Sequence, residues 1–179
     1  YRWQEWPTES PQRHNAMKTL LILRHAKSSW KDEQTPDHDR PLNKRGKRDA
    51  PRIGRLLHEC ELSPELIISS TAKRARKTAA KAAKECHYEG VIEMCGELYL
   101  APTREYLEVL RRVPNHVQRV MVVGHNPGAE DLVYELTGHS THFPTASLAQ
   151  VELDIEAWKE LSEETPGRLI QMWRPRELE

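Results

Sequence analysis

Apolar residues occur in this chain in two kinds of pattern. Short continuous runs such as TLLIL and RVMVV are typical of buried strands, whereas apolar residues three and four positions apart predict amphipathic helices. The runs predict strands at residues 19–23, 65–69, 91–94, 119–123, 148–153 and 169–173. The wider spacing predicts helices at residues 43–60, 72–86, 103–112 and 127–136. We expect the first of these helices to kink or restart at Pro51, because proline lacks the backbone donor of a helix interior.

Strand and helix signals alternate, and most connections between them are short. This order predicts an α/β fold, a three-layer α/β/α sandwich in which helices cover both faces of a mostly parallel sheet. At 179 residues the chain has the length of one ordinary domain. Residues 1–17 show neither periodicity, so we predict an N-terminal tail there, poorly ordered or docked, followed by a single domain at 18–179.

Composition narrows the class of protein. Charged residues make up 30% of the chain and hydrophobic residues 37%, a profile typical of soluble globular proteins. The sequence has no apolar run long enough to span a bilayer and no apolar signal core, so we expect a cytoplasmic protein without a membrane partner. Basic and acidic residues both number 27, and this balance argues against nucleic-acid binding.

Cofactor and metal motifs are also missing from the sequence. Cys60, Cys86 and Cys95 form no C-x-x-C pair, so we expect reduced thiols. His139 and His142 lie near each other but without cysteine or acidic companions at metal-ligand spacing. Since no nucleotide-binding glycine motif is present either, we predict no cofactor and no metal.

Basic side chains follow three of the apolar runs where the predicted strands end. The first strand runs into Arg24 and His25, the second into a segment that contains Arg74, and the fourth into His125. Because the carboxyl ends of parallel strands lie along one edge of a sheet, we expect these four side chains to meet in one crevice. Arginine donors match phosphate oxygens, and the helices that follow point their N-termini at the same place. The sequence therefore predicts a site for a phosphoryl group.

Histidine in such a site can act as a nucleophile and divide hydrolysis into two easier steps. Neighbouring cations should lower the pKa of His25 and stabilise charge on the phosphoryl oxygens. Each motif alone has an ordinary interpretation, since Arg74 lies in a basic run typical of a solvated helix face and Gly124-His125-Asn126 is typical of a turn. Their coincidence at three strand ends favours a catalytic site.

The same motifs carry a family resemblance. Leu-Arg-His-Ala-Lys-Ser at residues 23–28 resembles the Arg-His-Gly signature of the histidine phosphatase superfamily, which includes the phosphoglycerate mutases. Residues 69–79 and Val-Gly-His-Asn-Pro-Gly at 123–128 match two further motifs of that superfamily. Asp-Arg-Pro-Leu at 39–42, Phe-Pro-Thr at 143–145 and Trp-Arg-Pro at 173–175 resemble its SixA-type branch, the phosphohistidine phosphatases.

This resemblance implies a phosphoglycerate mutase-like fold and assigns roles to the four residues. By resemblance, His25 is the phosphorylated residue, and Arg24, Arg74 and His125 complete the phosphate pocket. Ala26 replaces the usual glycine of the signature, a change that SixA-type sequences share. Where mutases have Arg-His-Gly-Glu-Ser-x-Trp-Asn, this chain has Lys27 and Lys31 in place of the acid and the asparagine, which argues against the mutase reaction.

The proton donor is the open assignment. Many superfamily members place a glutamate after the third strand, where Glu97 and Glu105 are the candidates; both can equally be interpreted as surface carboxylates. An imidazole leaving group, with an ordinary pKa of about 6.5, departs more readily than an alkoxide. A phosphohistidine substrate therefore fits a site without a strong acid.

These observations favour a metal-independent phosphatase with a covalent phosphohistidine intermediate, acting on phosphohistidine in an acidic phosphorelay (HPt-like) protein. A small-molecule phosphomonoesterase with the same nucleophile is the alternative, and a catalytically silent phosphate-binding module is a third. Residues 18–90 carry a net charge of +7 and residues 91–179 carry −7. The basic run at 44–55, together with the basic residues at 73–84, is either a pair of solvated helix faces or a collar that steers an acidic partner.

Overall fold

The computed structural model describes residues 17–178, so all but the last residue of the predicted N-terminal tail lies outside the described residues. The described chain contains a six-stranded sheet with the strand order β3-β2-β4-β1-β5-β6. Strands β1 to β4 are parallel to one another, whereas β5 runs antiparallel to β1 and β6 antiparallel to β5. The strands are β1 (Lys18–Arg24), β2 (Leu66–Ser70), β3 (Glu93–Cys95), β4 (Arg119–Gly124), β5 (Leu148–Leu153) and β6 (Gly167–Trp173).

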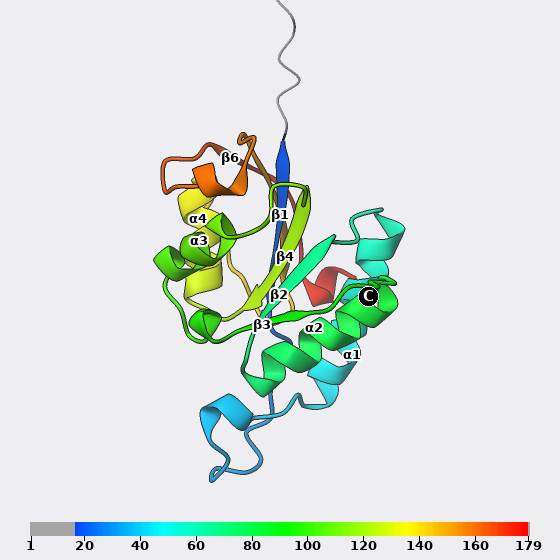
Figure 1. Ribbon diagram of the computed structural model, residues 1–179. Coiled ribbons are helices and arrows are strands. Elements are labelled where there is room, and N and C mark those ends of the chain that lie inside the picture. The colour runs from blue at the N-terminus through cyan, green and yellow to red at the C-terminus, as the bar shows by residue number, and fades with distance from the viewer. Residues whose placement is uncertain (1–16, 179) are drawn as a thin grey trace, which may run out of the picture.

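The α-helices of residues 17–178, four in number, cover the two faces of this sheet, as Figure 1 shows. Helices α1 (Lys44–Glu59) and α2 (Lys73–Glu85) lie on one face, and α3 (Thr103–Arg111) and α4 (Gly128–Thr137) lie on the other. Alternate side chains of the central strand β1 explain the two layers, because Leu20 and Ile22 pack in the α3/α4 core while Leu21 and Leu23 pack in the α1/α2 core. The predicted three-layer α/β/α sandwich with a mostly parallel sheet is confirmed.

Two predicted details differ from the structure. Helix α1 does not restart at Pro51 but continues without a break. The carbonyl left without a helical donor belongs to Lys47, which is exposed, so water can bind it. The third strand, predicted at residues 91–94, forms at Glu93–Cys95, because Val91 is 84% exposed and pairing with β2 begins only at Glu93.

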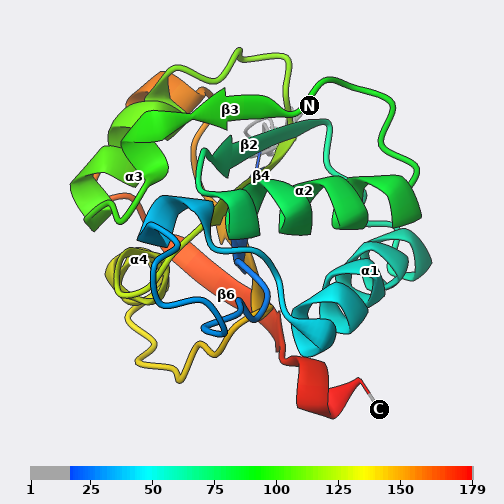
Figure 2. The ribbon, with the colours of Figure 1, turned by 90° about the horizontal axis from the view of Figure 1, so that it is seen from below.

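The strand order places the predicted site. Strands β2, β4 and β1 are neighbours, so their carboxyl ends lie side by side at the lower edge of the sheet in Figure 1. The His25 N–H extends the pairing by donating to the Gly124 carbonyl at 3.0 Å. Viewed from this edge, the connection from β1 to α1 crosses between the two helix layers (Figure 2). No helix within residues 17–178 has the length and apolar character needed to cross a membrane.

Candidate active site

Four side chains predicted from the strand ends meet at this edge of the sheet. The ring centroids of His25 and His125 are 5.0 Å apart, and Arg74 Nε lies 3.3 Å from His25 Nε2. Arg24, the last residue of β1, donates from Nη1 to the carbonyl of Phe143 at 3.0 Å. His25, Arg74 and His125 expose only 6%, 2% and 2% of their surfaces. Arg74 is therefore part of the buried cluster and not of a solvated helix face.

The hydrogen bonds of the His25 ring fix its tautomer, with Nδ1 facing a carbonyl and Nε2 facing the Nε–H of Arg74. Its Nδ1 lies 2.8 Å from the Ala26 carbonyl, which can only accept, so Nδ1 carries the proton and Nε2 carries the lone pair. Burial lowers the pKa of His25 to about 3; the hydrogen bond to Ala26 opposes this shift, and the charges of His125, Arg74 and Arg24 add to it. An unprotonated Nε2 at neutral pH is the form that a nucleophile needs.

Thr78 fixes the turn after His25 against α2. Its hydroxyl accepts from the Ala26 N–H at 2.9 Å and donates to the Arg74 carbonyl at 2.7 Å. The threonine of the motif at residues 69–79 thus joins the turn after His25 to the helix that carries Arg74.

His125 is oriented by two hydroxyl groups. Its Nε2 lies 2.7 Å from Ser70 Oγ, which also accepts from the Ala72 N–H at 3.3 Å; in the tautomer in which Ser70 donates to Nε2, the imidazole proton lies on Nδ1. The Tyr106 hydroxyl accepts from the His125 N–H at 3.1 Å and donates to its carbonyl at 3.4 Å. Burial lowers the pKa of His125 to about 3, the Arg74 charge adds to this, and Asp37 opposes it.

Two buried nitrogens of this cluster have no hydrogen-bond partner among the described residues. They are Arg24 Nε and His125 Nδ1. An unpartnered buried donor costs free energy, and such groups in a cationic cluster suit the oxygens of a tetrahedral anion. The arrangement therefore has donors that suit a phosphoryl group beside the unprotonated Nε2 of His25.

Comparison with known proteins gives the same family. Residues 20–98 match the model of the histidine phosphatase superfamily (branch 1). The crystal structure of an Agrobacterium tumefaciens protein assigned as the phosphohistidine phosphatase SixA is similar with a TM-score of 0.74 and 32% identity, covering 88% of this chain and 98% of that one. The chain belongs to the histidine phosphatase superfamily.

Further relatives of this superfamily member extend the likeness over most of the chain. A SixA-assigned structure from Nakamurella multipartitia has a TM-score of 0.79 and 26% identity, covering 89% of this chain and 96% of its own. An uncharacterized chloroplast protein of Arabidopsis thaliana is 32% identical over 152 residues, which is 80% of this chain and 70% of that protein. These matches extend well beyond residue 98 and so cover part of the chain that the family model does not reach.

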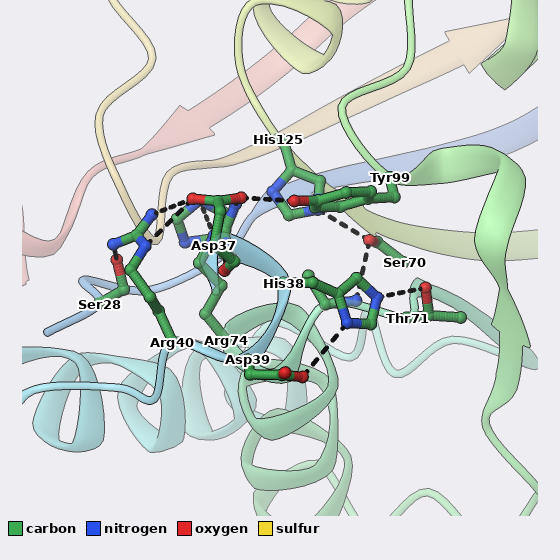
Figure 3. Close-up of polar contacts among 12 residues, drawn as sticks. Ser28, Asp37, His38, Asp39, Arg40, Ser70, Thr71, Arg74, Tyr99 and His125 are labelled. Carbon is green, nitrogen blue, oxygen red and sulfur yellow. Dashed lines mark hydrogen bonds and ion pairs between the residues drawn. The ribbon is translucent and has the colours of Figure 1, made fainter. Parts of the chain in front are cut away.

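Sequence reasoning missed an acidic residue of this histidine phosphatase site. Asp37 lies in the short helix η1 (Asp37–Asp39), between β1 and α1, and its carboxylate contacts Arg74, Arg40 and Tyr99 (Figure 3). The motif at 39–42 includes Arg40, but nothing in the pattern around Asp37 indicates that it lies in the site. Partial burial raises the pKa of Asp37, but hydrogen bonds from Tyr99, Arg40 and Arg74 outweigh this and hold it well below its ordinary range.

The two proton-donor candidates are placed differently. Glu97 is exposed and forms a two-pronged ion pair with Arg112, at 3.1 and 2.7 Å. Glu105 lies half-buried in the first turn of α3, beside Tyr106. Within residues 17–178 neither carboxylate forms a hydrogen bond with the four cluster residues, and a proton-donor role for either stays a prediction. In the same residues, no group of three or more His, Cys, Asp or Glu side chains could hold a metal ion.

Proposed function

We propose that this protein is a metal-independent phosphatase that removes the phosphoryl group from phosphohistidine in a phosphorelay (HPt-like) protein through a covalent intermediate on His25. The observation that carries the proposal is the His25 ring itself. Its Nδ1–H is bound to the Ala26 carbonyl, its Nε2 lies 3.3 Å from Arg74 Nε, and the ring is buried beside His125 and within the field of Arg24. This is the geometry of an activated nitrogen nucleophile in an anion site.

The reaction then has two transfers. His25 Nε2 attacks phosphorus while the bond from phosphorus to the substrate imidazole breaks, and the departing imidazole nitrogen takes a proton from solvent. In the second step a water attacks the phosphorus, the bond to Nε2 breaks, the water gives up a proton, and inorganic phosphate leaves. Arg24, Arg74 and the Nδ1–H of His125 stabilise the charge on the phosphoryl oxygens in both steps.

The ionised carboxylate beside Arg74 favours phosphohistidine over phosphate esters as the substrate. Asp37 is the carboxylate in contact with Arg74, and its lowered pKa keeps it ionised at neutral pH, so it does not supply a proton. An alkoxide leaving group needs a proton donor far more than an imidazole does. A phosphomonoesterase with the same nucleophile is the second candidate, and it would need a proton donor such as Glu97 or Glu105.

The test is a comparison of substrates on the wild-type protein and three variants. We expect turnover of a phosphohistidine-bearing HPt protein to exceed turnover of a panel of phosphate esters and to persist in EDTA. His25→Ala should abolish phosphoryl transfer while the protein stays folded. Arg24→Ala and Arg74→Ala should each lose about a hundredfold or more, by analogy with the loss of one oxyanion donor.

Four results contradict the proposal. Substantial activity in His25→Ala would require another nucleophile. Loss of turnover in EDTA, restored by a divalent ion, would show that a metal does the work assigned to the arginines. Faster turnover of an ester than of the phosphohistidine protein would favour the phosphomonoesterase, whereas phosphate binding without turnover of any substrate would favour the catalytically silent module.

A further inference from the structure

The carboxylate of Asp37 binds the arginine on which the proposed reaction depends. Asp37 Oδ2 accepts from Arg74 Nη2 at 3.0 Å and from the Tyr99 hydroxyl at 2.6 Å, and the Asp37 carbonyl accepts from Arg74 Nη1 at 2.6 Å. The remaining nitrogen, Arg74 Nε, faces His25 Nε2. All three nitrogens of this guanidinium therefore have partners within the protein.

A second arginine holds the other oxygen of the same carboxylate. Asp37 Oδ1 accepts from Arg40 Nε at 3.1 Å and from Arg40 Nη2 at 2.9 Å. Arg40 is itself buried, donates to Ser28 Oγ at 2.5 Å, and stacks on the ring of Trp30 at 3.6 Å. Asp37 thus has two guanidinium groups and a phenol around it, as Figure 3 shows, and this donor set also suits a phosphoryl group.

The two anions compete for the same donors. The oxygens of a phosphoryl group on His25 Nε2 would draw on the terminal nitrogens of Arg74, each of which already gives one of its two hydrogens to Asp37. The Asp37 side chain is 42% exposed, whereas that of Arg74 is 3% exposed. Helix η1 contains no buried residue, so moving it uncovers little apolar surface. Asp37 is therefore the partner that gives way when a phosphoryl group enters.

We propose that Asp37 is a displaceable internal anion that occupies Arg74 and Arg40 in the empty site and yields Arg74 to the phosphoryl group, which sets the affinity of the site for phosphorylated substrate and for phosphate. The inference rests on the proposed function for the identity of the incoming group. Asp37 competes with an incoming anion for the donors of Arg74, and its negative charge also repels that anion. Both effects weaken the binding of any anion at the cluster. A site that holds phosphate less tightly also releases the product faster.

The test replaces the charge and keeps the shape. Tungstate, a tetrahedral anion, is titrated calorimetrically into the wild-type protein and into Asp37→Asn at fixed ionic strength. We expect the dissociation constant to fall by about tenfold or more in Asp37→Asn, on the scale of one charge-assisted hydrogen bond. With a phosphohistidine protein as substrate, KM should fall while kcat stays equal or decreases.

Asp39→Asn is the matched control. Asp39 belongs to the same short helix and undergoes the same change of charge, but its carboxylate lies 3.5 Å from His38 and is 63% exposed. The control should change the dissociation constant by less than about twofold, since exposed charges are well screened. Tyr99→Phe, which removes one hydrogen bond to Asp37 and no charge, should tighten tungstate binding in the same direction by a smaller factor.

Several outcomes overturn the inference. Weaker tungstate binding in Asp37→Asn would show that Asp37 is a fixed partner that positions Arg74. The competition argument would also fail if tungstate affinity were unchanged in both Asp37→Asn and Tyr99→Phe. It would fail equally if Asp39→Asn changed the affinity as much as Asp37→Asn does, or if none of the proteins bound tungstate. Because tungstate affinity is an equilibrium measurement, it separates this inference from the proposed function, which is tested by turnover and by His25→Ala.

Discussion

The two histidines at the carboxyl ends of β1 and β4 are neutral because they are buried beside cations. Each has its pKa lowered to about 3, against an ordinary value near 6.5. Between these two values the unfolded chain binds protons that the folded protein excludes, so folding stability is complete above about pH 6.5 and decreases as the pH falls toward 3. The decrease amounts to roughly 1.4 kcal/mol per pH unit for each histidine in that window.

We therefore predict that the free energy of unfolding, measured by urea denaturation, falls steeply from pH 7 to pH 4, and that His25→Ala makes this decrease shallower. At pH 5, ¹⁵N chemical shifts should show a neutral His25 ring with its proton on Nδ1. A His25 ring that takes up a proton near pH 6.5, or a variant with the full wild-type pH dependence, would contradict the assigned tautomer and burial.

At the scale of elements, helix α3 positions His125, the residue that follows β4. Tyr106 of α3 binds both the N–H and the carbonyl of His125, and a β-carbon at Gly124 would lie only 2.0 Å from the Tyr106 hydroxyl oxygen. The glycine before His125 therefore makes room for the hydroxyl. Burial raises the pKa of Tyr106 to about 12, so this hydroxyl keeps its proton at neutral pH.

Tyr106→Phe should destabilise the protein by about 1–3 kcal/mol, because it leaves the buried His125 N–H without a partner. It should also lower kcat by at least severalfold, because the His125 ring is then less firmly placed. Denaturant melts and steady-state rates measure the two effects. Tyr134→Phe, on an exposed tyrosine of α4, is the control and should leave both values near wild type. A Tyr106→Phe protein of normal stability would show that the two hydrogen bonds do not fix His125.

The site residues at the strand ends could be predicted from the sequence because they directly follow recognisable apolar runs. The apolar runs gave the strands, and the rule for parallel sheets brought Arg24, His25 and His125 to one edge. Arg74 was within reach of the same argument, since it follows β2 by four residues. The third strand was displaced by two residues at its start because a short edge strand has little burial to define it.

Site residues in irregular segments could not be predicted by this reasoning, because it depends on periodic patterns. Asp37 and Tyr99 lie in connections without periodicity, and only the three-dimensional path of η1 brings the first beside the second. Glu97 was a candidate because of its position after a strand, yet whether such a carboxylate faces the cluster or Arg112 depends on side-chain packing that spacing does not encode.

At the scale of the whole molecule, the basic half of the sequence, residues 18–90, gathers lysine side chains around a hollow on one side of the site. A hollow of about 370 Å³ lies between α1, α2 and the end of the connection that leaves the site. Pro41 and Leu42 line it together with four lysines, Lys47, Lys73, Lys77 and Lys81. Within residues 17–178 none of the four lysines forms an ion pair, so their field is not neutralised locally. An acidic protein that carries the proposed phosphohistidine would be attracted to this side of the site.

We predict that the double charge reversal Lys77→Glu/Lys81→Glu lowers kcat/KM for an acidic phosphohistidine protein by about tenfold at low salt and flattens its dependence on salt. The reason is that exposed charges act mainly on association and are screened beyond about 8 Å at physiological ionic strength. The same variant should act almost normally on a small phosphate compound, because neither lysine contacts the four cluster residues.

The matched control for this reversal is Lys159→Glu/Arg168→Glu. It makes the same change of net charge at the other end of the sheet, where Arg168 pairs with Glu152 at the level of Thr19, near the start of β1.

The decisive quantity is the ratio of the losses in kcat/KM for the protein substrate and for the small compound. Equal losses for both substrates would mean that the lysines shape the site itself. An equal loss in the control would mean that net charge alone acts, and no loss in either variant would identify the basic run as a pair of solvated helix faces. Only a loss confined to the protein substrate and to the lysine variant supports steering by this surface.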